Sequence, residues 1–300
     1  MVVKLPREVT DWIREAFDEA SKRTANLMAR VPNCPEESVD VDLVSALEAY
    51  SYPVEFPDGW AVRLTTHFIG GLKQYRSWEV ADIGLFVVIR QHGRVLRNKV
   101  CLLQSKRLYP TNEAVEVKES LDYGIGMLAH LQKRREFPVA VGAVNYVFDG
   151  QSKYGALVAH DRQHELLKEF AQANATPVHY LLYSPPTVPF SVRLPRGPEA
   201  IELQPVEVGA VVVIGAQVLS ALDAMSPGQT PTYDGIHAAA RNWSLGSFVA
   251  DEFLVCRQGR ILGDLEEPSD IGIFYRRSGP IFASIVIGIE APDDAELVMD

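Results

Sequence analysis

The stretch WEVADIGLFVVIRQHGRVLRNKVCLLQSKRLYP, from Trp78 to Pro110, contains two apolar runs joined by a short polar loop. Gly93 in the loop favours a turn, so we expect strands over about 80–90 and 99–106 to form an antiparallel hairpin. Asp82, Gln104 and Lys106 interrupt this apolar pattern. A buried lysine or carboxylate is costly unless it is paired or ligated, so their placement in the hairpin requires a reason.

The register of the hairpin groups these three side chains. A turn centred near residue 94 places Asp82 opposite Lys106 and Gly84 opposite Gln104, because each pair of residue numbers sums to 188. Side chains alternate along a strand, so Asp82, Gln104 and Lys106 are expected on one face of the sheet. A slip of one residue would move Asp82 to the opposite face.

The composition of the chain is that of an ordinary globular protein. Its 300 residues are 47% hydrophobic and 23% charged, enough to bury a sizeable core. No apolar run is long enough to cross a bilayer, and the first residues lack the pattern of a signal peptide. The isolated cysteines Cys34, Cys101 and Cys256 indicate a reducing compartment. We therefore expect a cytoplasmic protein with no membrane partner.

The charge of the chain is unevenly distributed. The net charge is -10, yet the window from Arg90 to Asn112 has no acid and a charge of +6, which leaves -16 for the remainder. The basic residues of this window are Arg90, Arg94, Arg97, Lys99, Lys106 and Arg107. They are candidates for contacts with a nucleic-acid backbone, and the alternative is a solvated hairpin on which charges cluster by chance.

The order of predicted elements indicates an α/β fold with a mixed sheet flanked by helices. Helices are expected at 6–30, about 39–50, 120–135, 162–175 and near 243–257. Strands are expected at about 60–69, in the hairpin, and at 139–148, 154–160, 177–183 and 281–290; residues 206–225 are ambiguous. Five prolines between Ser184 and Ala200 mark the clearest break. This pattern predicts an N-terminal helical segment (1–54), a core (55–185) and a C-terminal extension or subdomain (186–300).

The three polar residues of the hairpin suit phosphodiester hydrolysis. A carboxylate from Asp82 and an amide oxygen from Gln104 are ligands for Mg²⁺ or Mn²⁺, and the backbone carbonyl of Ser105 could add a third. Lys106 would orient or deprotonate a metal-bound water, or stabilise charge on the phosphate. The hairpin therefore predicts a metal-dependent hydrolase acting on nucleic acid.

An acid that opens one strand, followed by Gln-x-Lys on the next ("LLQSK"), resembles the PD-(D/E)XK nuclease superfamily. The Gln-x-Lys form is similar to that of Mrr-type restriction endonucleases and related phage-defence nucleases. The resemblance covers about residues 55–185. It implies a restriction-endonuclease-like mixed sheet and a Mg²⁺-dependent endonuclease that acts on DNA, in restriction or phage defence.

Carried over by position, the resemblance makes Asp82 the metal acid, Gln104 the second ligand and Lys106 the catalytic lysine. Many members add a glutamate just before the metal acid, and Glu79 matches that place. The chain departs from the pattern in having Ala81 where the family name has proline, and Gln104 where glutamate is more usual. A neutral amide binds a cation less strongly than a carboxylate, so either Glu79 completes the site or the metal binds fully only when a DNA phosphate is present.

Further residues are candidates for supporting roles. Tyr109 follows the Gln-x-Lys strand and could contact a base or a phosphate, Lys133 and Arg134 could hold the backbone, and His67 could approach the site. For both Tyr109 and His67, an ordinary packing role is the simpler explanation. In the segment HDRQH (160–164), Asp161 as a helix N-cap is a simpler explanation than a metal site.

Two classes of function remain open from the sequence. The first is the nuclease, acting alone, as a homo-oligomer or with a defence partner. The second is a non-catalytic nucleic-acid-binding or scaffold protein that keeps a nuclease fold, which the glutamine and the acidic remainder of the chain favour. Neither a P-loop nor a G-x-S-x-G motif is present.

Overall fold

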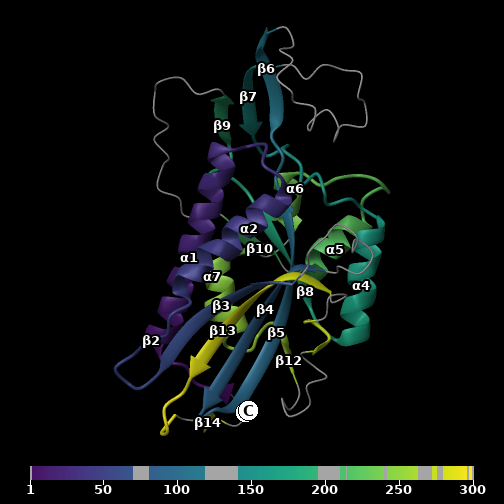
Figure 1. The fold of residues 1–300 in the computed structure, drawn as a ribbon. Helices are drawn as coiled ribbons and strands as arrows, with labels where there is room; N and C mark the ends of the chain where they lie inside the picture. Colours follow the sequence, from purple (N-terminus) through teal and green to yellow (C-terminus); the bar gives the residue numbers. More distant parts are fainter. Residues whose placement is uncertain are drawn as a thin grey trace.

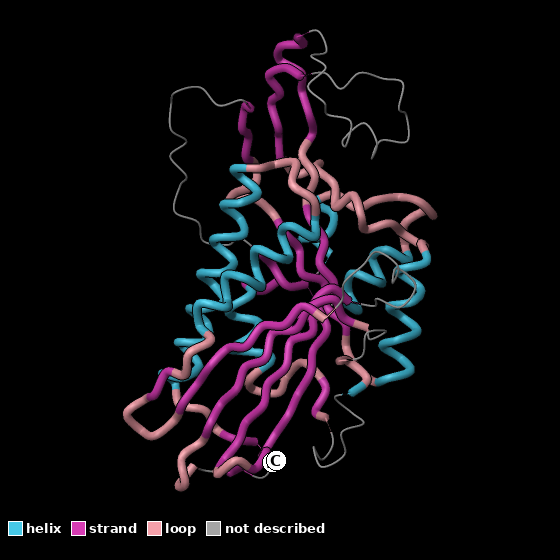
Figure 2. The backbone as a smooth tube through the Cα atoms, in the orientation of Figure 1, coloured by secondary structure: helices cyan, strands magenta, loops and turns pink. Residues whose placement is uncertain are grey.

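The computed structural model of the protein describes residues 2–69, 81–118, 141–194, 210–213, 215–239, 242–262, 272–275, 280–295 and 297–298. These residues form a mixed α/β fold around a large twisted sheet, with helices on either side of it (Figures 1 and 2). This agrees with the α/β class and the flanked mixed sheet that the sequence predicts.

The large sheet combines segments that lie far apart in the sequence. Its strands, in spatial order, are β11 (Asn242–Ser244), β10 (Ala210–Val213), β8 (Val178–Tyr183), β5 (Arg94–Arg107), β4 (Ala81–Gln91), β13 (Ile281–Glu290), β3 (Ala61–Phe68) and β2 (Val54–Glu55), with β12 (Arg260–Ile261) beside β5. Strand β13 lies between β3 and β4 and runs parallel to β4. Strands β5 and β8 are also parallel.

The hairpin of β4 and β5 forms with a register two residues away from the expected one. Ile83 pairs with Leu103, and this ladder brings Asp82 level with Gln104 rather than with Lys106. The loop is tighter than expected, because His92 and Gly93 both have positive φ (51° and 73°) and make a two-residue turn. A shift of two residues preserves the face of every side chain, so the predicted grouping of Asp82 with Gln104 survives.

Helices cover the sheet on both sides. The described helices are α1 (Arg7–Arg30), α2 (Glu36–Leu47), η1 (Glu48–Tyr50), α4 (Arg162–Asn174), α5 (Gly215–Asp223), α6 (Tyr233–Ala239), α7 (Leu245–Ser247) and the π-helix η3 (Phe248–Phe253). Helix α1 buries an apolar stripe that includes Val9, Ile13 and Phe17, and it packs on α2. Helix α2 crosses β3, β13 and β5, whereas α4 and α5 lie on the right in Figure 1.

A smaller sheet projects beyond the helices, at the top of Figure 1. It consists of β6 (Thr111–Lys118), β7 (Val141–Phe148) and β9 (Phe190–Leu194), all antiparallel. Strand β6 starts four residues after the end of β5, so this sheet begins at the end of the hairpin that carries Lys106. Two strands at the chain ends, β1 (Val2–Val3) and β14 (Leu297–Val298), pair separately.

Most predicted elements are confirmed, and two require correction. Residues 154–160 form turns rather than a strand: Tyr154 and Ala159 make single backbone hydrogen bonds to Pro231 and Gln229, and the isolated β-bridges of this region belong to Lys153, just before them. Residues 243–257 combine β11, α7 and η3 instead of one helix. The ambiguous segment contains both a strand (β10) and a helix (α5), while the helix expected at 120–135 lies outside the described residues.

Segments from all three expected parts of the chain lie close together. Strands from 186–300 enter the same sheet as the hairpin, and β13 lies inside this sheet, between β3 and β4. The expected division into three parts stays a prediction. Within the described residues, no helix is long and apolar enough to cross a membrane.

Candidate active site

Asp82, Gln104 and Ser105 meet where β4 begins and β5 nears its end. Oδ2 of Asp82 accepts a hydrogen bond from the side-chain amide of Gln104 and another from the backbone N–H of Ser105, at 2.7 Å. The hydroxyl of Ser105 is 2.8 Å from the same oxygen. The predicted acid and amide are therefore in direct contact.

Helix α2 places two further carboxylates over these strands. Glu36 and Asp40 are four residues apart and so lie on one face of the helix. Oε1 of Glu36 is 3.2 Å from Nζ of Lys106, and its Oε2 accepts the backbone N–H of Arg107 at 2.9 Å. The side chain of Lys106 is only 3% exposed. Glu36 therefore fixes the position of the lysine through both its side chain and the strand that carries it.

Asp40 is the most deeply buried acid of the group. Only 2% of it is exposed, and its Oδ1 accepts a hydrogen bond from the hydroxyl of Tyr183 at 2.7 Å. Its Oδ2 lies 2.8 Å from Oγ of Ser105. Ser105 thus stands between Asp40 and Asp82, and its hydroxyl has a single proton to give to one of them.

Burial changes the protonation of this acidic cluster. Loss of water raises the pKa of Asp40 well above its ordinary value, and the nearby charge of Asp82 raises it further. Burial also raises the pKa of Asp82, although Lys106 and the two hydrogen bonds from Ser105 oppose the shift. A protonated Asp40 can donate to Ser105, which then donates to an ionised Asp82, so each close contact becomes a hydrogen bond.

Lys106 retains its charge in this environment. Burial alone lowers the pKa of Lys106, but the carboxylates of Glu36 and Asp82 outweigh that effect and raise it above the ordinary value. An ammonium group with a raised pKa cannot remove a proton from water near neutral pH. Of the roles expected for Lys106, the geometry favours a donor and a positive charge directed at phosphate.

Two oxygens of the cluster are available to a cation. Oε1 of Gln104 is buried without a hydrogen-bond partner, and Oδ1 of Asp82 accepts no hydrogen bond from a described residue. An orphaned buried oxygen is costly, and a hard cation would satisfy it. The carboxylates of Glu36 and Asp82 also outnumber the one positive charge of Lys106. The residues present therefore fit Mg²⁺ or Mn²⁺, with Asp82 and Gln104 as ligands and the carbonyl of Ser105 nearby, 3.4 Å from the Gln104 amide.

Three cations of the basic window, Arg97, Lys99 and Arg107, are buried and bound to acceptors of the protein itself. Lys99 is 2% exposed, and its ammonium donates to the carbonyl of Phe253 at 2.5 Å and lies 4.8 Å from the centre of that ring. Arg97 donates to Sγ of Cys256 at 2.8 Å. Arg107 is buried and donates to the carbonyls of Pro32 and Leu108. These cations hold β5 against its neighbours, because each is surrounded by protein acceptors.

The remaining candidates are scattered. Arg90 and Arg94 lie at the turn of the hairpin; Arg94 is separated from Lys106 by twelve residues, about 40 Å along a strand. His67 is exposed on β3, which β13 and β4 separate from β5. Tyr109 alone lies beside the cluster. Glu79, Lys133 and Arg134 fall outside the described residues.

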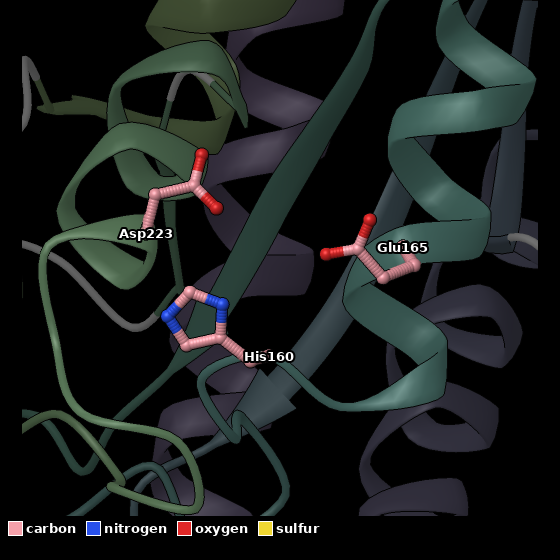
Figure 3. Close-up of side chains that lie close together, drawn as sticks. All are labelled: His160, Glu165 and Asp223. Carbon is pink, nitrogen blue, oxygen red and sulfur yellow. The ribbon is translucent and has the colours of Figure 1, made fainter.

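A second group of potential ligands lies between α4 and α5. His160, Glu165 and Asp223 point toward a common space in Figure 3. All three are exposed, and Asp223 already contacts Lys168 at 3.1 Å and His164 at 2.9 Å. The hydrogen bond from Lys168 lowers the pKa of Asp223. As expected, Asp161 caps α4 by accepting the N–H of His164 at 2.8 Å, so this group has a structural explanation.

Glu36 and Asp40 are the site residues that sequence reasoning missed. We expected the second helix to start near residue 39, which left Glu36 outside it. Helix α2 begins at Glu36, directly after Pro35. The spacing of the two acids in PEESVDVD is the signal that could have identified them, because residues four apart share a helix face.

Comparison with known proteins gave no match: no family model, no curated protein and no solved structure is significantly similar to this chain.

Proposed function

We propose that this chain is a metal-dependent nuclease that hydrolyses phosphodiester bonds, with DNA as its substrate. One observation carries the proposal: Asp82, Gln104 and Lys106 converge with Glu36 and Asp40 at one end of the hairpin, and two oxygens there have no hydrogen-bond partner among the described residues. The resemblance to PD-(D/E)XK nucleases of the Mrr type supports the same chemistry and a role in restriction or phage defence.

Each residue has a distinct task in the proposed reaction. A bound divalent cation would supply a nucleophilic water and neutralise charge on the phosphate. Asp82 and Gln104 would hold that cation. Lys106, kept cationic by Glu36 and Asp82, would donate to a phosphate oxygen and stabilise the charge that develops there. Asp40 and Tyr183 fix Ser105 and, through it, the orientation of Asp82.

Plasmid and oligonucleotide cleavage with Mg²⁺ or Mn²⁺ tests the proposal. Wild type is expected to cut, and Lys106→Met and Asp82→Asn are expected to lose cleavage by at least about 100-fold, the scale of removing one group that stabilises a transition state. Glu37→Gln is the matched control, because it removes one exposed negative charge beside Glu36. Cleavage that survives in both site variants would refute the assignment.

A non-catalytic binding protein is the second candidate, and one contact favours it. The amide nitrogen of Gln104 already donates to Asp82, so the contact between these two side chains forms without a cation. Titration calorimetry with Mn²⁺ separates the two candidates. Binding that Asp82→Asn abolishes supports the nuclease, whereas no Mn²⁺ binding supports the scaffold.

A further inference from the structure

Tyr109 begins a row of side chains that leads away from the candidate active site. The five residues before it, from Gln104 to Leu108, are at most 3% exposed, whereas Tyr109 is 39% exposed. Its backbone N–H donates to the carbonyl of Lys153 at 2.9 Å, and Lys153 in turn pairs with Thr232. Directly paired residues in antiparallel segments point to the same side. Tyr109, Lys153 and Thr232 therefore form a row with a spacing of about 5 Å.

The ring of Tyr109 is held rigidly in this row. The guanidinium of Arg107 lies 4.4 Å from the ring centre, and Gly155 lies so close that an added Cβ would be 2.9 Å from Cδ2 of the ring. No described residue forms a hydrogen bond with the Tyr109 hydroxyl. The charges of Glu36, Arg107 and Lys106 all act on this hydroxyl, which places it near the cluster. It is a fixed donor without an acceptor.

The other end of the row opens into a cavity of about 620 Å³. Lys153 and Thr232 line it together with α5, α6 and the loop between them. The apolar part of its lining includes Ala221, Met225, Pro231 and Ile236. This volume and this mixture of apolar walls with a few polar groups are typical of a small-molecule site.

The loop at the cavity is already fixed in shape. The N–H of Gly228 donates to the carbonyl of Ala159 at 3.0 Å, and the N–H of Ala159 donates to the carbonyl of Gln229 at 2.8 Å. The side chain of Gln229 also accepts the N–H of Ser226 at 3.0 Å. A ligand would therefore meet a formed pocket, with little ordering cost on binding.

We infer that this row and cavity bind one unpaired nucleotide of the substrate strand, next to the phosphate that is cut. The inference rests on the proposed nuclease function. Tyr109 and Lys153 donate to phosphate oxygens, and the cavity holds the base against its apolar wall. Lys153 is exposed and forms no ion pair with a described residue, so its charge is free for phosphate. A base enters a pocket only outside a duplex, so the substrate class is single-stranded nucleic acid or an unpaired end.

The test measures binding of a fluorescein-labelled 12-nucleotide DNA strand in EDTA, so that a metal-dependent nuclease cannot cut it. Lys153→Gln is expected to weaken binding and to reduce the slope of log K against log salt by about 0.7, the value for one phosphate contact on a single strand. Tyr109→Phe keeps the ring and removes only the hydroxyl. Lys4→Gln, another exposed lysine, is the control.

An abasic nucleotide scanned along the strand tests the pocket itself. At one position it is expected to weaken wild-type binding about 10-fold, the scale of losing one protein–base contact. In Ala221→Leu, which fills the cavity, the scan should become flat while the thermal melting curve stays cooperative. Three results overturn the inference. The first is a wild-type affinity that is the same at every abasic position, and the second is an equal loss of affinity in Lys153→Gln and Lys4→Gln. The third is a duplex whose affinity depends on Lys153 as much as that of the single strand.

The two proposals fail in different ways. If no nucleic acid is cut in Mg²⁺ or Mn²⁺ but binding still depends on Lys153 and the abasic position, the nuclease proposal falls and the nucleotide pocket stands. If the strand is cut at the same rate by wild type, Lys153→Gln and Ala221→Leu, the nuclease stands and the pocket falls.

Discussion

Asp40 and Asp82 approach the same hydroxyl: an Oδ2 atom of each lies 2.8 Å from Oγ of Ser105. Because Ser105 can donate only one proton, both contacts are favourable only when one carboxyl is protonated or a cation is bound. Burial and the neighbouring charge of Asp82 raise the pKa of Asp40 well above its ordinary value. Of the two carboxyls, Asp40 is therefore the one that holds a proton more readily in the cation-free protein.

Asp40→Asn should stabilise the protein above neutral pH. The pKa of Asp40 is higher in the folded than in the unfolded state, so the folded protein binds this proton more tightly. The contribution of Asp40 to the free energy of unfolding is therefore largest below about pH 4, the unfolded pKa, and falls as pH rises toward the folded pKa. Asparagine reproduces the protonated acid and does not titrate. Urea denaturation should show that the free energy of unfolding decreases less between pH 5 and pH 8 in Asp40→Asn than in wild type. A greater loss would contradict the assignment of the proton.

Lys106 should remain a cation throughout the working pH range. Glu36 and Asp82 raise its pKa above 10.5, so nuclease activity should show no decline from lysine deprotonation up to about pH 10. Initial rates at saturating Mg²⁺ between pH 7 and 10 measure this. In Glu36→Gln the alkaline limit should move to lower pH, because one of the two stabilising carboxylates is lost. If instead the cleavage rate rises with pH and the midpoint of the rise is the pKa of Lys106, the lysine acts as a general base.

A divalent cation should stabilise the fold through Asp82. Binding to the folded state alone adds RT ln(1 + [L]/Kd), about 1.4 kcal/mol at ten times Kd. For a domain of this size, that raises Tm by roughly 3 °C. Differential scanning fluorimetry with Mg²⁺ and Mn²⁺ should show the shift in wild type and in Glu37→Gln, but not in Asp82→Asn. An equal shift in Asp82→Asn would place the cation elsewhere.

Gly84 should not tolerate a side chain. A Cβ there would lie 2.7 Å from Cδ1 of Ile281 and 2.8 Å from the ring of Phe86, both within the core. We expect Gly84→Ala to destabilise by about 1–3 kcal/mol through overpacking. Gly288→Ala on the neighbouring strand is the control, because its closest contact is an ordinary 3.5 Å to Arg63. Equal unfolding midpoints for the two variants would show that Ile281 and Phe86 move aside.

Lys99→Met should leave nucleic-acid affinity unchanged. The ammonium is enclosed by Phe253, and burial lowers the pKa of Lys99. The unfolded lysine binds its proton more tightly, so wild-type stability should rise with pH from the folded pKa toward 10.5, and this rise should vanish in Lys99→Met. Strand binding and denaturation curves measure the two effects. Weakened binding in a stably folded variant would restore the basic window as an interface.

The hairpin was predictable because its pattern is local. Alternating apolar residues and Gly93 define two strands, and the period of two assigns Asp82 and Gln104 to one face even when the register is wrong by two residues. The basic window misled for a related reason. Charge on a strand looks solvent-exposed until the neighbours are known, and η3, which encloses Lys99, comes from a distant part of the chain.

The contribution of α2 was not predictable in the same way. The apolar residues that indicated a helix, such as Val41 and Val44, placed its start near residue 39, so Glu36 was left outside it. Its role depends on how α2 crosses β5, which is a matter of packing between elements and not of spacing within one. The same holds for β13, whose sequence predicts a strand but not its position between β3 and β4.

The position of β13 has a consequence for the synthesis of this protein. Asp82 lies on β4, which pairs with β13 on one side and β5 on the other, and β13 begins 200 residues after β4 in the sequence (281 minus 81). A nascent chain emerges from its N-terminus, so the strand that lies between β3 and β4 is made long after both of them. Until then, the edges of β3 and β4 that pair with β13 have no partner. A product terminated before Ile281 therefore lacks the strand that pairs with β4 beside Asp82.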